Sequence, residues 1–223
     1  MKNKKITIIV IAIVLAVGMG GSIIWALKPF SYPAKKNILI NSSKKITAPT
    51  EEKVKIKTEK QSADSLNIID KLVNWGFQKT SGRKIDTIII HSSYDALGKN
   101  PYDVDGLVEE YKSYGVSPHY LIDREGNIYR LVPDEDIAYQ AGAGRTPDGR
   151  TDVNAFSIGI EMMNAKTDKN TGVQYASLSK LLSYLEQKYK IKYVLGHDQI
   201  APGRKTDPWN FDWNQIKSLV PAY

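Results

Sequence analysis

The segment IDTIIIH (85–91) constrains the fold more than any other part of the chain, because three consecutive isoleucines, Ile88, Ile89 and Ile90, make both faces of a strand hydrophobic. Strands of this kind are covered on both sides, as the central strands of parallel or mixed sheets are. Layers of helices provide that cover in α/β domains. The segment therefore predicts a central strand in a layered α/β domain.

Strand-like and helix-like patterns alternate through residues 65–223, which we expect to form one domain. We expect further strands at 120–122, 128–131, 156–162 and 193–195, helices at 68–73, 104–114, 178–189 and 214–220, and loops at 142–151 and 198–213. Asp103 and Gly115 suit the two ends of the second helix. Glu125–Gly126 suits the turn of a hairpin between the first two of these strands. The pattern predicts a central mixed β-sheet flanked by helices, a class that by itself implies no function.

An uncharged apolar run at 6–27 follows Lys2, Lys4 and Lys5. At 1.5 Å per residue it is long enough for a hydrocarbon core of about 30 Å, and the basic flank favours a cytoplasmic N-terminus. We therefore expect a cytoplasmic basic tail (1–5), a transmembrane signal anchor (6–27) and a domain on the extracytoplasmic side. A cleaved signal peptide is the alternative.

The basic charge of the chain is concentrated at its N-terminal end. The whole chain has a net charge of +7, but its first 60 residues contain twelve Lys and three Glu, so the remainder is slightly acidic. With its prolines and charge runs, the segment 28–64 is typical of a flexible basic stalk. A neutral domain without a basic patch predicts no nucleic-acid partner.

The absence of cysteine limits any metal site to histidine and carboxylate ligands. Of the three histidines, His91 and His197 each close an expected strand, and Asp207 follows in the next loop. Two histidines and one carboxylate with a fourth position open to water form the pattern of a catalytic zinc site. A histidine at a strand end is also a common structural residue, so this pattern alone leaves both interpretations open.

Three motifs resemble one family. The segments IIIHSS (88–93), SIGIE (157–161) and GHDQIAPGRKTDP (196–208) are similar, in the same order, to N-acetylmuramoyl-L-alanine amidases of the type-2 amidase family. This family includes phage lysozyme-like amidases and peptidoglycan recognition proteins. The nearest resemblance is to the bacterial branch that hydrolyses anhydro-muropeptides.

The resemblance implies a role for each matching residue. It assigns Zn²⁺ binding to His91, His197 and Asp207, proton transfer to Glu161, and stabilisation of the reacting carbonyl to Lys205. These roles agree with general chemistry, because zinc lowers the pKa of a bound water towards about 7 and a nearby carboxylate can transfer its proton. The alternatives are that Glu161 orients a ligand imidazole, that Lys205 is a surface cation, and that Asp207 caps a turn.

Two further positions are candidate substrate-binding residues by the same resemblance. His119 lies at the start of the expected hairpin, where the family lines its substrate groove, and it is otherwise a polar residue at the rim. Asn154 matches a groove asparagine that would bind the stem peptide, or it braces a loop.

The chain also departs from the family at two places. Pro118 replaces the tyrosine of phage-type members, and Tyr139-Gln140-Ala141-Gly142 lies where the family usually has Trp-His. Without a tyrosine at position 118, the resemblance implies that Glu161 and Lys205 are the catalytic residues. The change at 139–142 affects the rim of the substrate groove.

The sequence thus predicts a zinc-dependent amidase that cuts the bond between N-acetylmuramic acid and the L-alanine of the stem peptide. Its partner would be peptidoglycan or a muropeptide, and its location the bacterial cell membrane as a single-pass protein. The alternatives are a non-catalytic peptidoglycan-binding receptor on the same fold, an enzyme for another amide bond, and a structural zinc domain. No feature of the sequence indicates an oligomeric state.

Overall fold

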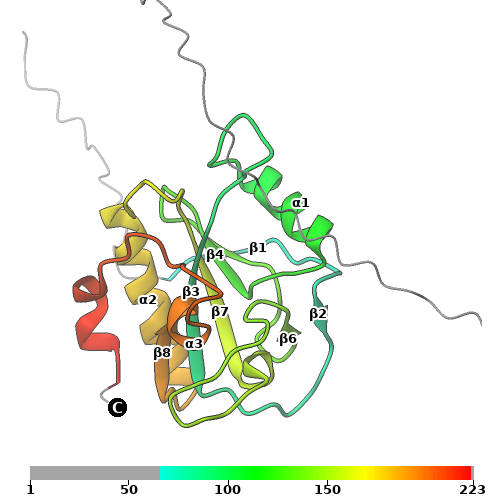
Figure 1. Cartoon of the computed structure of the whole chain (residues 1–223), viewed down its shortest axis with the longest axis vertical. Coiled ribbons are helices and arrows are strands. Elements are labelled where there is room, and N and C mark those ends of the chain that lie inside the picture. The colour runs from blue at the N-terminus through cyan, green and yellow to red at the C-terminus, as the bar shows by residue number, and fades with distance from the viewer. Residues whose placement is uncertain (1–65, 222–223) are drawn as a thin grey trace, which may run out of the picture. The chain divides into compact units, whose positions relative to one another are not determined.

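The computed structural model describes residues 66–221. Its main element is a six-stranded mixed sheet in the order β1-β5-β4-β7-β3-β8 (Figure 1). The strands are β1 (Ile68–Asp70), β3 (Thr87–Ser93), β4 (Tyr120–Ile122), β5 (Ile128–Arg130), β7 (Ser157–Met163) and β8 (Tyr193–Gly196). Neighbouring strands are parallel, except that β4 and β5 form an antiparallel hairpin. A separate antiparallel pair joins β2 (Phe77–Gln78) and β6 (Ile137–Ala138).

Helices cover both faces of the sheet. The two longer ones are α1 (Val104–Tyr114) and α2 (Gly172–Lys188), and the short ones are η1 (Val153–Phe156), α3 (His197–Ile200) and η2 (Trp213–Leu219). Side chains alternate between the faces of a strand, and Tyr120 and Ile122 of β4 pack with α2, whereas Leu121 packs with α1. The two longer helices therefore lie on opposite faces, which confirms the predicted mixed sheet flanked by helices.

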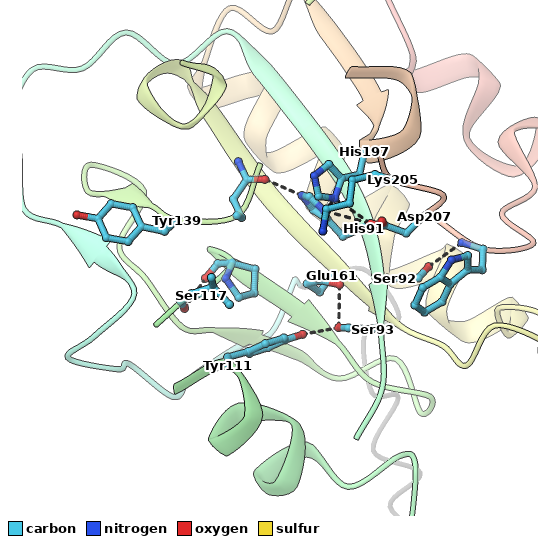
Figure 2. A pocket seen from close by; sticks show the side chains of 14 residues that line it. His91, Ser92, Ser93, Tyr111, Ser117, Tyr139, Glu161, His197, Lys205 and Asp207 are labelled. Carbon is cyan, nitrogen blue, oxygen red and sulfur yellow. Dashed lines mark hydrogen bonds and ion pairs between the residues drawn. The ribbon is translucent and has the colours of Figure 1, made fainter. Parts of the chain in front are cut away.

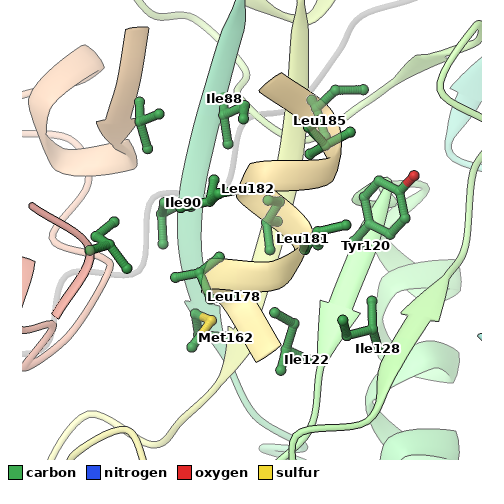
Figure 3. Packing of buried hydrophobic residues seen from close by; sticks show 14 of the residues in the cluster. Ile88, Ile90, Tyr120, Ile122, Ile128, Met162, Leu178, Leu181, Leu182 and Leu185 are labelled. Atoms are coloured by element: carbon green, nitrogen blue, oxygen red, sulfur yellow. The ribbon is translucent and has the colours of Figure 1, made fainter. Parts of the chain in front are cut away.

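The larger core lies between the sheet and α2 (Figure 3). Ile88 and Ile90 of β3 point to the same side as α2, which contributes four buried leucines, Leu178, Leu181, Leu182 and Leu185. Burial of each such side chain stabilises the fold by about 1.5–3 kcal/mol. Because Ile89 and His91 alternate with the two isoleucines, they face the other side of the sheet. Because α2 packs on the face with Ile88 and Ile90, the polar side chain of His91 lies on the opposite face of β3.

Several sequence predictions are confirmed with nearly unchanged boundaries. The helix α1 has Asp103 as its N-cap, whose side chain accepts hydrogen bonds from Asp105 N and Gly106 N, and it ends at Gly115 with φ of 64°. The hairpin of β4 and β5 turns at Gly126, which has φ of 83°. A positive φ favours glycine at both positions.

Other predicted elements differ from the structure. The segment 68–73, expected as a helix, contains strand β1, because three of its residues pair in parallel with β5 at the edge of the sheet. The helix α2 begins at Gly172, six residues before the expected start, because Thr171 and Gln174 form a capping box. The expected loop 198–213 includes the single helical turn α3. The short strands β2 and β6 were not predicted.

The predicted location in the bacterial cell membrane, with a single pass, requires correction. Among residues 66–221, no helix is long and apolar enough to cross a membrane. The longest of them, α2, has 17 residues and carries charged side chains, whereas a span needs about 20 mainly apolar residues. The segments 1–5, 6–27 and 28–64, on which the predicted tail, anchor and stalk depended, lie outside the described residues.

A buried carboxylate ties the end of α2 to the sheet. The side chain of Asp134 is 1% exposed and accepts hydrogen bonds from Tyr120 Oη at 2.6 Å, Lys188 Nζ at 2.8 Å and Tyr189 Oη at 2.9 Å. Although burial opposes ionisation, the hydrogen bonds from Lys188 and Tyr120 lower the pKa of Asp134 below its ordinary value. The folded protein therefore keeps this carboxylate charged in more acidic solution than the unfolded chain does.

We expect Asp134→Asn to lower the free energy of unfolding at pH 7 by about 2 kcal/mol, because a charged acceptor of several hydrogen bonds is lost. A lowered pKa in the folded state contributes stability above the unfolded pKa of about 3.9, and this contribution is lost as the pH falls through the folded pKa. Urea unfolding between pH 7 and pH 2 should therefore show a smaller acid-induced loss in the variant than in the wild type. Glu109→Gln, on the exposed face of α1, is the control. Parallel pH curves for the wild type and Asp134→Asn would contradict this role.

Candidate active site

The candidate site lies where three parallel strands end. His91 is on β3, Glu161 is its register partner on β7, and His197 follows the last residue of β8. Because β7, β3 and β8 are neighbours and run in the same direction, their carboxyl ends meet at one edge of the sheet. Three side chains from distant parts of the sequence are thereby brought together. Asp207, from the loop after α3, completes the group (Figure 2).

Three of these side chains present ligand atoms to one another. The Nδ1 atoms of His91 and His197 are 3.0 Å apart, and Asp207 Oδ2 lies 3.3 Å and 3.1 Å from them, respectively. Ligands placed tetrahedrally at about 2.0–2.1 Å around zinc are separated by roughly 3.3 Å. All three residues are buried, and they form a group that could hold a metal ion. The structure thus brings together the three residues that the sequence predicted as zinc ligands.

The outer sides of both imidazoles are also fixed. His91 Nε2 lies 2.6 Å from Gln140 Oε1, and His197 Nε2 lies 3.0 Å from the carbonyl oxygen of Ala141. Both partners are acceptors, so each imidazole donates through Nε2–H and turns the Nδ1 lone pair inward. Burial lowers the pKa of His91 and so favours its neutral form, whereas the Asp207 carboxylate favours the charged form. Two lone pairs and a carboxylate facing one another make a site that suits a cation.

Glu161 lies in the same pocket with an altered acidity. Burial, together with the charge of Asp207, raises the pKa of Glu161 to about 8, while a hydrogen bond from Ser93 and the charge of Lys205 lower it. Ser93 Oγ donates to Glu161 Oε2 at 2.8 Å. Ser93 Oγ also contacts Tyr111 Oη, at 2.5 Å. A carboxyl group with a pKa near neutral can both accept and release a proton.

A cavity of about 250 Å³ opens beside these groups. It is lined by His91, Ser92, Ser93, Tyr111, Val116, Ser117, Pro118, Tyr139, Gln140, Glu161, His197, Lys205, Asp207 and Trp209. Lys205 therefore shares the cavity with the candidate metal ligands and Glu161, as Figure 2 shows. A smaller hollow of about 200 Å³, lined by Tyr139, Asn154, Arg204 and others, shares Lys205 and His197 with it.

His119 does not reach the cavity. It is fully buried, and its Nδ1 accepts a hydrogen bond from Gly159 N at 3.0 Å, so its Nε2–H donates to Asp136 O at 3.1 Å. Burial and the charge of Arg83 lower the pKa of His119 to about 3. Both ring nitrogens are used inside the protein, and no surface is left for a ligand to contact.

Asn154 is placed differently. Its Oδ1 accepts hydrogen bonds from the backbone N–H groups of Gln140, at 3.2 Å, and Ala141, at 2.8 Å. Asn154 thus braces the loop whose residues contact both imidazoles, and it also borders the smaller hollow. The two hydrogen bonds to the backbone of Gln140 and Ala141 agree with the interpretation of Asn154 as a residue that braces a loop.

Sequence reasoning missed Ser93, Tyr111 and Gln140 as parts of the site. Ser93 lies two residues after His91 in one of the recognised motifs, and this position was the available signal. Gln140 belongs to the segment 139–142, which the sequence linked only to the rim of the groove, and no local pattern indicates that Tyr111 of α1 points to the site.

In the metal-free protein we expect Ser93→Ala to raise the pKa of Glu161 above about 8. Ser93 donates to the carboxylate and so favours its charged form; one hydrogen bond to a charged group contributes about 1.5–3 kcal/mol, and a rise of about one pH unit corresponds to 1.36 kcal/mol. Carbon-13 NMR titration of labelled glutamate measures the shift. Ser113→Ala, on the exposed side of α1, is the control. An unchanged or lower pKa in Ser93→Ala would contradict this contact.

Comparisons with known proteins match the part of the chain that builds the site. The family model described as N-acetylmuramoyl-L-alanine amidase matches residues 81–210. The chain is 41% identical over 108 residues to 1,6-anhydro-N-acetylmuramyl-L-alanine amidase AmpD of Citrobacter freundii, an alignment that covers 47% of this chain and 57% of that relative. The chain thus spans little more than half of that relative's length.

Two solved structures have a similar fold. A selenomethionine derivative of AmpD gives a TM-score of 0.56 at 29% identity, covering 67% of this chain and 93% of AmpD. AmiD of Escherichia coli, in a complex with the substrate anhydro-N-acetylmuramic acid-L-Ala-D-γ-Glu-L-Lys, gives 0.54 at 29% identity, covering 66% of this chain and 61% of AmiD. The family match runs through β3, β7, β8 and the loop with Asp207, which carry the candidate metal ligands and Glu161, and the chain therefore belongs to the N-acetylmuramoyl-L-alanine amidase family.

Proposed function

We propose that this protein is a zinc-dependent hydrolase that cuts the amide bond between the lactyl group of N-acetylmuramic acid and the L-alanine of the stem peptide. The observation that carries the proposal is the triangle of His91 Nδ1, His197 Nδ1 and Asp207 Oδ2, with sides of 3.0–3.3 Å, at the wall of a cavity that also contains Glu161 and Lys205. Family membership supports it.

His91, His197 and Asp207 would hold the zinc ion. Two neutral imidazoles and one carboxylate leave a net charge of +1 with Zn²⁺ and an open fourth position, as in catalytic zinc sites. When bound, zinc would supply a Lewis acid that lowers the pKa of a water molecule towards about 7. The three residues would thus hold the ion that activates the attacking water at neutral pH.

Glu161 is the proton-transfer group in this proposal. It shares the cavity with the ligand triangle, and burial raises its pKa to about 8 in the metal-free protein. As a base it accepts the proton of the attacking water, and as an acid it delivers a proton to the nitrogen of L-alanine, which leaves as an amine. Proton transfer of this kind contributes about 10²–10⁴-fold to the rate.

Lys205 stabilises the oxygen of the reacting carbonyl as it becomes negative. Its charge already acts on Glu161 across the cavity. One well-placed donor at a developing oxyanion contributes about 3 kcal/mol. The positive charge of Lys205 also favours the ionised form of Glu161, which is the form that accepts a proton.

The relatives indicate the class of substrate. The AmpD relative is named for anhydro-N-acetylmuramyl-L-alanine, and AmiD was solved with an anhydro-muropeptide. We propose a muropeptide or peptidoglycan strand as the substrate of this chain, with the scissile amide placed in the cavity between Lys205 and Glu161.

Digestion of purified muropeptides by the full-length protein, followed by mass spectrometry, tests the proposal directly. We expect free stem peptides that begin with L-alanine and the matching anhydro- or N-acetylmuramic acid product, because the amide between them is cut. A chelator should abolish these products and added Zn²⁺ should restore them. Binding of muropeptide without products, with or without zinc, would instead indicate a non-catalytic receptor. Products cut at another bond would contradict the proposed specificity.

We expect Glu161→Gln to bind zinc with an affinity close to that of the wild type but to lose about 10²–10⁴-fold in kcat, because the amide cannot accept the proton. Zinc competition with a chromophoric chelator and release of stem peptide measure the two effects separately. Glu109→Gln on α1 is the matched control. Full turnover in Glu161→Gln would exclude the proton-transfer role.

A further inference from the structure

The outer nitrogens of the two candidate zinc-binding imidazoles are held by one short segment, Gln140–Ala141. The Gln140 side chain accepts from His91 Nε2, and the Ala141 carbonyl oxygen accepts from His197 Nε2. Adjacent residues therefore contact histidines that are 106 positions apart in the sequence. Such outer contacts determine which ring nitrogen carries the proton, and therefore which nitrogen is free to bind a metal.

Gln140 has its amide group oriented by a second contact. Its Nε2 donates to Ser157 Oγ at 2.8 Å, which directs Oε1 towards His91 at 2.6 Å. Ser157 is the first residue of β7, the strand that carries Glu161. A residue of the sheet thus holds the amide in place beside the imidazole.

The neighbouring position on β7 leaves room for this side chain. A Cβ atom on Gly159 would lie 2.6 Å from Gln140 Cγ, closer than real Cβ atoms approach other atoms. Gln140 therefore lies directly over Gly159, on the same face of β7 as Ser157 and Glu161. The side chain fills a space that exists because residue 159 has no side chain.

The backbone of the segment is anchored as well. Asn154 Oδ1 accepts from both Gln140 N and Ala141 N, and the Asn154 carbonyl oxygen accepts from Arg83 Nη1 at 2.8 Å. The loop cannot move away from the imidazoles without breaking these bonds. The contacts form a continuous path from Asn154, through Gln140 and Ala141, to the two histidines.

We propose that Gln140 is a positioning residue that fixes His91 as the Nε2–H tautomer, so that its Nδ1 lone pair is presented to the metal. This inference rests on the proposed function, since it assumes that the triangle binds zinc. Gln140 lies in the segment 139–142, where the family that the sequence resembles usually has Trp-His. Gln140 acts on the metal through the ring of His91, whose outer nitrogen it contacts.

The test compares Gln140→Leu, which has a similar volume but no acceptor, with Gln140→Glu, which keeps an acceptor for His91. Zinc affinity of the full-length chain is measured by competition with a chromophoric chelator. We expect Gln140→Leu to bind zinc about 10–100-fold more weakly, as for the loss of other outer contacts of metal-binding histidines. Gln140→Glu should remain within a few-fold of the wild type. Gln187→Leu, at an exposed position of α2, is the control.

Nitrogen-15 NMR of the metal-free protein gives a readout that is independent of zinc and of activity. With three histidines in the chain, the His91 ring can be assigned, and we expect the wild type and Gln140→Glu to carry the proton on Nε2. Gln140→Leu should show a mixture of tautomers. Ser157→Ala, which removes the orienting contact but keeps Gln140, should give a smaller change in the same direction.

The outcomes separate this inference from the proposed function. A wild-type chain that fails to bind zinc would overturn both. A wild type that binds zinc, together with Gln140→Leu of equal affinity and unchanged His91 tautomer, would overturn the positioning role alone. If metal-free Gln140→Leu has a lower thermal stability but an unchanged zinc affinity, Gln140 is purely structural. This result would also overturn the positioning role.

Discussion

The parallel pairing of β3 with β7 on one side and β8 on the other is the constraint on which the rest of the site depends. It brings His91, Glu161 and His197 to the same edge of the sheet. A shift of register by one residue would turn His91 to the face covered by α2, where Ile88 and Ile90 pack. The hydrophobic core and the candidate site are therefore specified by the same alternation of side chains.

The site concentrates groups that repel one another in the absence of a cation. Two imidazole lone pairs and a carboxylate face each other within 3.3 Å, and Glu161 lies buried nearby. The fold maintains this arrangement from outside, through the contacts of Gln140 and Ala141 with the imidazoles. The same arrangement explains the chemistry proposed for it, because it favours binding of a divalent cation next to a carboxyl group that exchanges protons near neutral pH.

The strongest predictions from the sequence concerned features with a local physical cause. The apolar run of β3, the cap and stop of α1 and the turn of the hairpin were confirmed, since burial, capping and a positive φ are properties of a few adjacent residues. The segment 68–73 was predicted wrongly as a helix, because its three paired residues become a strand through contact with β5, 60 positions further along the chain. The predicted location at a membrane was not supported by any described helix.

By itself the sequence predicted the candidate ligand set: without cysteine, two histidines at strand ends and one aspartate fit the pattern of a zinc site, and the family resemblance marks the same three residues. Tertiary structure alone decided what surrounds them. It placed His119 inside the protein and assigned Asn154 to the loop that supports Gln140, because hydrogen bonds between distant segments depend on strand order and loop path. Strand order and loop path cannot be read from a few adjacent residues. The chemical type of each side chain can, and it shows which residues are able to bind a metal.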